Sequence, residues 1–175
     1  MNYKKLNKII LASLIAAMIC ASALLIHLPI PGGNGYLNIS DAFCILAGIL
    51  LGPVYGGIAA ALGSSLCDLV LGYAYYIPAT AVIKGLVAVI AFFAAKKLRK
   101  HRYISYIIAS ICAEVIMPPL YFLYEYFALG YNMSALGNLG FNFLQGAVSA
   151  LLAVLILAAL SKAKLIDKLN PDNNR

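Results

Sequence analysis

Apolar residues fill most of this chain in long runs, which short polar or glycine-rich stretches separate. A membrane-spanning helix needs about 20 mainly apolar residues. By that criterion we expect helices over these ranges: 7–28, 40–52, 54–72, 78–97, 103–128 and 135–161. The pattern therefore predicts an all-α integral membrane protein, a bundle of six transmembrane helices, with residues 1–175 forming a single membrane domain.

The boundary between the second and third ranges leaves the number of spans open. Only Gly52-Pro53 separates them, and the second range is short. Proline disfavours helical conformation in the residue before it, so this pair predicts a break. The alternative is one long helix over 42–71, which gives five spans instead of six.

The composition agrees with a membrane protein and argues against a nucleic-acid partner. Hydrophobic residue types make up 63% of the 175 residues and charged types only 11%, whereas soluble domains carry about 25% charged residues. The net charge of +7 comes from basic residues beside the apolar runs, where topology signals lie. The four cysteines form no CxxC pair and lie in apolar stretches, so we expect neither a metal site nor a cofactor.

The basic residues also distinguish between the two span counts. They gather at the N-terminus, in residues 96–102 and at the C-terminal end, and only Lys84 lies apart from these clusters. With six spans all three clusters are cytoplasmic, whereas five spans would place residues 96–102 outside. Lys and Arg are enriched in cytoplasmic loops, which favours six spans with both termini cytoplasmic.

The first apolar run has two further interpretations. It resembles a signal peptide, because a basic start and an apolar core precede Ala21-Ser22-Ala23, a possible cleavage site. Its small residues favour retention, since Ala12 and Ala16 have the spacing that lets helices approach closely. That face could pack inside the bundle or dock a separate membrane partner.

Polar side chains recur on single faces of the later helices, over the half of the membrane that faces out. Residues three or four positions apart share one face of a helix. Ionisable groups within spans are costly and often functional, so we expect these faces to converge on one cavity open to the outside. The candidate ligand contacts are Lys84, Glu114, Tyr121, Glu125, Asn138, Asn142 and Gln145.

The chemistry of these side chains suits binding more than catalysis. Amides donate and accept hydrogen bonds, as a neutral heterocycle requires, and Tyr121 could stack on a planar ring. Asp68 and Lys84 could form a structural salt bridge or contact the ligand. Two alternatives remain: an intramembrane enzyme that uses Glu114 or Asp68 as its base, and a structural protein whose polar groups only join helices. The chain has no G-x-x-x-x-G-K-[ST] loop for ATP, so we expect a binding protein and no enzyme.

The glycine-rich outer loop 29–39 is a candidate lid over that cavity. Its glycines at 32, 33 and 35 permit backbone conformations closed to other residues, which suits a movable segment. We expect Ser40 or Asp41 to cap the helix that follows. The candidate ligand contacts in the loop are Asn34, Tyr36 and Asn38.

A series of short motifs runs through residues 35–93. N-x-x-D-A comes first, then LLGP-x-x-G, G-S-x-x-x-D-L-x-x-G-Y and P-A-T-x-x-I-K-G-L. In this order the chain resembles the S components, which are the substrate-binding membrane subunits of energy-coupling factor (ECF) vitamin transporters. The resemblance covers nearly the whole chain and is closest to members associated with hydroxymethylpyrimidine, pyridoxine or similar precursors.

The resemblance implies a function and a set of partners. An S component captures a small water-soluble vitamin or precursor from outside, for ATP-driven uptake by an ABC-type importer in a prokaryotic plasma membrane. The face at Ala12 and Ala16 would dock the transmembrane coupling subunit. Two cytoplasmic ATPase subunits would supply the energy.

Overall fold

The computed structural model describes residues 3–31, 35–98 and 100–166. Five of its helices are long and apolar enough to cross a membrane, and the predicted ranges 40–52 and 54–72 both fall on one of them. The elements, in chain order, are α1 (Tyr3–Leu25), β1 (Leu28–Pro29), β2 (Tyr36–Leu37), α2 (Asp41–Val70), the 3₁₀ helix η1 (Ala74–Tyr76), α3 (Ile77–Lys97), α4 (Arg102–Leu123), the π-helical turn η2 (Tyr124–Ala128) and α5 (Met133–Lys162).

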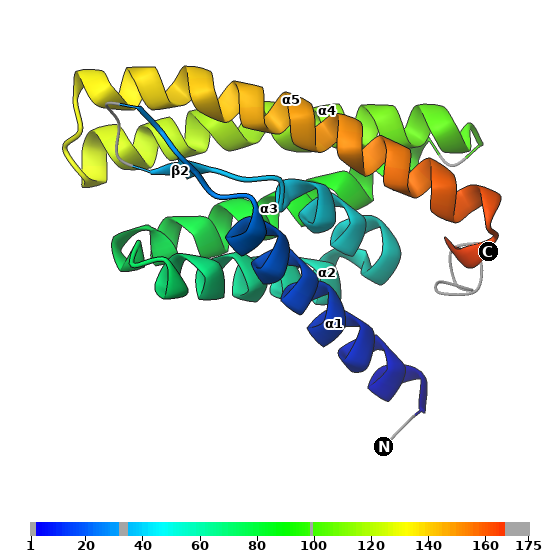
Figure 1. Cartoon of the computed structure of the whole chain (residues 1–175). Helices are drawn as coiled ribbons and strands as arrows, with labels where there is room; N and C mark the ends of the chain where they lie inside the picture. The colour runs from blue at the N-terminus through cyan, green and yellow to red at the C-terminus, as the bar shows by residue number, and fades with distance from the viewer. Residues whose placement is uncertain (1–2, 32–34, 99, 167–175) are drawn as a thin grey trace.

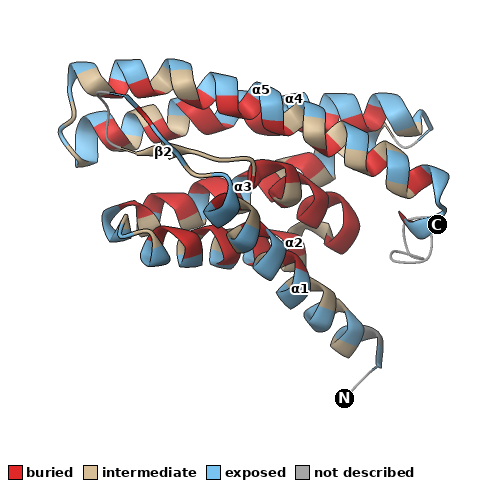
Figure 2. Ribbon diagram, in the orientation of Figure 1, coloured by how far each residue is buried: buried red, intermediate tan, exposed pale blue. Residues whose placement is uncertain are grey.

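The helices form two layers, with α1 across one of them. Helices α4 and α5 lie side by side in one layer, α2 and α3 pack together in the other, and α1 lies against α2 (Figure 1). Buried residues concentrate between the layers, while the outward faces are exposed (Figure 2). Those exposed faces carry large apolar side chains such as Leu62, Ile111 and Leu151, which is the surface that a lipid environment requires.

Helix α2 is interrupted at Gly52, so the predicted break is present. Gly52 has φ 85° and ψ 177°, a region essentially reserved for glycine. The chain reverses direction at Gly52. The evidence is that the Cys44 sulfur, before the break, lies 3.7 Å from the Ser64 hydroxyl oxygen, after it. A continuous helix would separate two residues 20 positions apart by about 30 Å at 1.5 Å per residue. Residues 41–51 and 53–70 are therefore two antiparallel helical segments that pack on each other.

Glycines bring α2 into backbone contact with its neighbours. A Cβ atom added to Gly48 would lie 1.9 Å from the Ala88 carbonyl oxygen of α3. One added to Gly63 would lie 2.5 Å from the Ala16 carbonyl oxygen of α1. These approaches leave no room for a larger side chain, so the two segments of α2 form the centre around which α1 and α3 pack.

Candidate functional site

A cavity lies where the β1–β2 hairpin meets α2, α3, α4 and α5. The space between its lining side chains, together with the part open to solvent, is about 490 Å³. Its lining is polar and aromatic although the chain around it is apolar. The predicted residues that line it are Tyr36, Asn38, Lys84, Tyr121, Glu125, Asn142 and Gln145.

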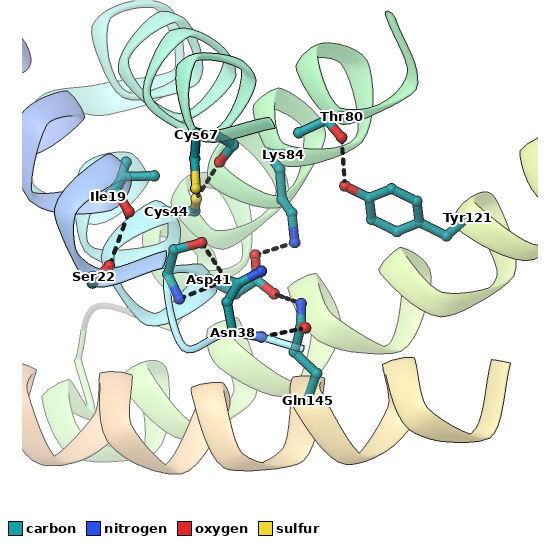
Figure 3. Close-up of polar contacts among 12 residues, drawn as sticks. Ile19, Ser22, Asn38, Asp41, Cys44, Cys67, Thr80, Lys84, Tyr121 and Gln145 are labelled. Atoms are coloured by element: carbon teal, nitrogen blue, oxygen red, sulfur yellow. Dashed lines mark hydrogen bonds and ion pairs between the residues drawn. The ribbon is translucent and has the colours of Figure 1, made fainter. Parts of the chain in front are cut away.

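A buried hydrogen-bond network joins three elements at one side of the cavity. The Lys84 ammonium of α3 donates to Asp41 Oδ1, and the Gln145 amide of α5 donates to Asp41 Oδ2 at 2.7 Å (Figure 3). The same Gln145 accepts a bond of 2.9 Å from the backbone N–H of Asn38. Both oxygens of Asp41 are thereby satisfied, and the chain leaving the hairpin is tied to α5.

The hairpin is also held at its other side. Strands β1 and β2 are antiparallel, with Leu28 opposite Leu37. The Tyr36 hydroxyl donates to Asp68 Oδ1 of α2 at 2.7 Å. Burial first, and then the neighbouring Asp68 carboxyl, raise the pKa of Tyr36 far above its usual range, so the hydroxyl keeps the proton that it donates.

A second carboxyl group faces the cavity from η2. Glu125 accepts a bond of 2.9 Å from the Tyr76 hydroxyl and one of 3.0 Å from the Asn138 amide. Nearby, the Tyr121 hydroxyl of α4 donates to the Thr80 hydroxyl of α3 at 3.1 Å. These bonds connect α3, α4 and α5 around the cavity and fix the orientation of its polar side chains.

Tyrosine rings form one wall of the cavity. The ring centroids of Tyr36 and Tyr73 are 5.0 Å apart, those of Tyr73 and Tyr76 are 6.3 Å apart, and those of Tyr76 and Tyr121 are 6.2 Å apart. Tyr36, Tyr76 and Tyr121 line the cavity itself. The wall offers flat apolar surface together with hydroxyl groups, which suits a planar ring that carries polar substituents.

Not all of the predicted contacts reach the cavity. Glu114 is buried behind it, where its side chain packs on Gly146 at the α4–α5 contact. Asn138 is fully buried and contacts Glu125 without lining the cavity. Asn34 lies outside the described residues, as do the glycines at 32 and 33.

The prediction that the side chain of Ser40 or Asp41 caps α2 is wrong for both residues. Ser40 is at the N-cap position but makes no side-chain capping bond, because its hydroxyl donates to the Asn38 side chain at 2.6 Å. The Asp41 carboxyl is taken by Lys84 and Gln145. The alternative of an Asp68–Lys84 salt bridge is wrong as well, since Lys84 pairs with Asp41 and Asp68 accepts from Tyr36.

Several lining residues were missing from the predicted set. Thr80 and Tyr76 precede Lys84 by four and eight positions, so helical spacing could have included them. Asp68 and Ser64 share a face of α2 in the same way. The role of Asp41 in the network beside the cavity could not be predicted from helical spacing, because its hydrogen-bond partners lie on α3 and α5. The missed lining residues with polar side chains are Ser40, Ser64, Cys67, Tyr76 and Thr80.

The predicted docking residues lie outside the cavity. Ala12 and Ala16 are half-buried on α1 and line a separate apolar groove between α1 and α2. The backbone at Ala16 also contacts Gly63 of α2. The small residues of α1 thus pack within the bundle in part, while Ile10 and Leu14 of the same helix remain exposed.

Comparison with known proteins decides the family. The family model for the S component of ECF-type riboflavin transporters matches residues 3–162. This chain belongs to that family. It is also 29% identical over 138 residues to an uncharacterized protein in gap 3′region of Pyrococcus woesei, covering 79% of this chain and 88% of that one.

The fold of this S component agrees with a solved structure. A structure described as the S component of a bacterial ECF transporter superposes with a TM-score of 0.69 and covers 90% of this chain and 97% of that chain. Sequence identity between the two is 22%, so the likeness concerns the fold. The S-component fold and the long apolar helices together identify a multi-pass membrane protein of a transport system.

Proposed function

We propose that this S component captures a small water-soluble vitamin or vitamin precursor from outside the cell and presents it for ATP-driven uptake. The observation that carries the proposal is the polar, aromatic cavity beneath the hairpin, set within an otherwise apolar bundle. Asn142 supports ligand binding most directly. It lines the cavity, and among the described residues its amide has no hydrogen-bond partner, so its donors and acceptor are available to a ligand.

We further propose six membrane crossings with both termini cytoplasmic, in a prokaryotic plasma membrane. The reversal at Gly52 supports this count, because it divides α2 into two antiparallel segments. Six crossings also keep the basic clusters on one side of the membrane. Reporter proteins fused to each terminus, with a fluorophore that matures only in the cytoplasm, should both fluoresce. A dark reporter at either end would contradict this topology.

The proposed partners are a transmembrane coupling subunit and two cytoplasmic ATPase subunits. The groove that contains Ala12 and Ala16 supports the first, since its small residues would permit close approach of another helix. Substitution of both alanines by leucine should prevent co-purification with the coupling subunit and leave ligand binding intact. Loss of ligand binding in the same variant would instead indicate that this face stabilises the bundle.

For the ligand we propose the hydroxymethylpyrimidine or pyridoxine type. A single substituted ring suits a site whose lining combines tyrosine rings with the amide groups of Asn142 and Gln145. The protein should be purified in detergent, and any retained molecule should be identified by mass spectrometry. Calorimetric titration of the protein with hydroxymethylpyrimidine, pyridoxine and riboflavin then ranks these compounds by affinity. An empty cavity and no binding across a wider vitamin panel would overturn the proposal.

A further inference from the structure

The lining of the cavity in this S component contains more carboxyl groups than basic groups. Its described lining contains two carboxyl groups, Asp68 and Glu125, and one basic group, Lys84. The charge of Lys84 is already compensated by Asp41, whose side chain is completely buried. The ion pair therefore contributes no net charge, and two carboxyl groups face the cavity without a basic partner among the described residues.

The two carboxyl groups differ in how well the protein satisfies them. Glu125 accepts one hydrogen bond at each oxygen, from Tyr76 and from Asn138. Asp68 accepts one at Oδ1 from Tyr36. Its Oδ2 is buried and accepts no hydrogen bond of normal geometry from any described residue, although Asp68 as a whole is only 3% exposed.

An unpartnered carboxylate oxygen in a buried site is unfavourable, so Asp68 Oδ2 requires a proton or a positively charged partner. Because Asp68 lines the cavity, a bound molecule can supply that partner. A charge-assisted bond from a protonated nitrogen to a carboxylate is about twice as strong as a bond between neutral groups. The low dielectric around the cavity strengthens it further.

The tyrosine wall favours the same kind of ligand. The faces of aromatic rings attract cations within about 6 Å of the ring centroid. The protein already uses this attraction, since the Lys84 nitrogen lies 5.3 Å from the Tyr121 centroid. Tyr36 joins the two features, because its hydroxyl bonds to Asp68 and its ring belongs to the wall.

We propose that the ligand of this cavity is an aromatic heterocycle that carries a positively charged nitrogen, with the charge held by Asp68 beside the tyrosine wall. This inference rests on the proposed function and, within the class of substituted single rings, favours the members that carry a positively charged nitrogen. The amide of Asn142 lies in the same cavity and remains available to the uncharged substituents of the ring.

Matched ligand pairs test the charge directly. Pyridoxamine and pyridoxine differ by an aminomethyl in place of a hydroxymethyl group, as do the 5-aminomethyl and 5-hydroxymethyl forms of 4-amino-2-methylpyrimidine. Calorimetry at pH 7 should show the aminomethyl member of at least one pair, which carries the additional ammonium group, binding more tightly by about tenfold to a hundredfold, the range expected for a hydrogen bond to a charged group. Thiamine (cationic) and riboflavin (uncharged) extend the panel.

Variants of Asp68 show where the preference arises. Asp68→Asn should reduce the preference to about threefold or less, while Asp68→Glu, which keeps the charge, should retain it. Glu114→Gln removes a buried carboxyl group that does not line the cavity, and it should leave the preference intact. Thermal unfolding of each variant separates loss of binding from loss of fold.

The outcomes separate this inference from the proposed function. Equal or tighter binding of the hydroxymethyl members, or binding of riboflavin alone, overturns the cationic ligand and leaves the binding subunit in place. An unchanged preference in Asp68→Asn also overturns it, because the charge would then be recognised elsewhere. If no compound of the panel binds and none co-purifies, both proposals fail.

Discussion

Lys84 on α3 and Asp41 in the first turn of α2 form an ion pair inside the protein, although they lie 43 positions apart in the sequence. The two side chains are 4% and 0% exposed. Asp41 also accepts from Gln145, so one carboxyl group holds α2, α3 and α5 together beside the cavity.

Removal of one partner of this pair should destabilise the protein strongly. Asp41→Leu or Lys84→Met leaves an uncompensated buried charge, and we expect a loss of about 3–5 kcal/mol for either. The double variant should lose less than the sum of the two. Thermal unfolding can be followed with a thiol-reactive dye, because Cys44 and Cys67 are buried in the folded protein. Fully additive losses of unfolding free energy would show that Asp41 and Lys84 have no stabilising interaction with each other.

The contact of α2 with α3 at Gly48 should tolerate no side chain. A Cβ atom there would lie 1.9 Å from a backbone oxygen, so Gly48→Ala forces the helices apart and should lower the unfolding temperature by several degrees. The matched control is Gly140→Ala, since nothing lies within 4 Å of a Cβ atom at Gly140. It should be neutral or stabilise α5 by about 0.5–1 kcal/mol. Equal effects at both positions would contradict the packing described for α2.

Two amides on one face of α5 should respond differently to substitution. Asn142 has no hydrogen-bond partner among the described residues and lines the cavity, so Asn142→Leu should abolish ligand binding and leave the unfolding temperature almost unchanged. Gln145 bonds to Asn38 and Asp41, so Gln145→Leu should lower that temperature as well. Calorimetry measures ligand binding, and thermal unfolding with the thiol-reactive dye measures the unfolding temperature. A destabilised Asn142→Leu would indicate that this amide only joins helices.

The bond between Tyr36 and Asp68 should govern how long the hairpin stays closed. Tyr36→Phe removes the donor to Asp68 and keeps the ring, so ligand dissociation should accelerate by roughly tenfold, the equivalent of one hydrogen bond of about 1.4 kcal/mol. Stopped-flow fluorescence measures the rate, and amide hydrogen exchange at residues 35–38 should rise in parallel. If amide hydrogen exchange became faster but the rate of ligand dissociation did not change, opening of the hairpin would not limit ligand release.

Local periodicity predicts long apolar helices and places several of the cavity-lining residues on shared helix faces. Asn142 and Gln145 lie three positions apart on α5, and that spacing alone places them on one face. The partner of Asp41 could not be predicted in this way, because it depends on the reversal at Gly52 and on the packing of α3 against α2. The Tyr36–Asp68 bond joins residues 32 positions apart, so it too arises only from the assembled bundle.

The orientation of the Gln145 amide has a consequence for opening of the hairpin. Its oxygen faces the backbone N–H of Asn38, and its nitrogen faces the Asp41 carboxyl. A rotation of the amide by half a turn would set oxygen against carboxylate and nitrogen against N–H, so both contacts would become repulsive together. The Gln145 amide therefore has a single favourable orientation, in which it holds both the chain leaving the hairpin and the first turn of α2 to α5.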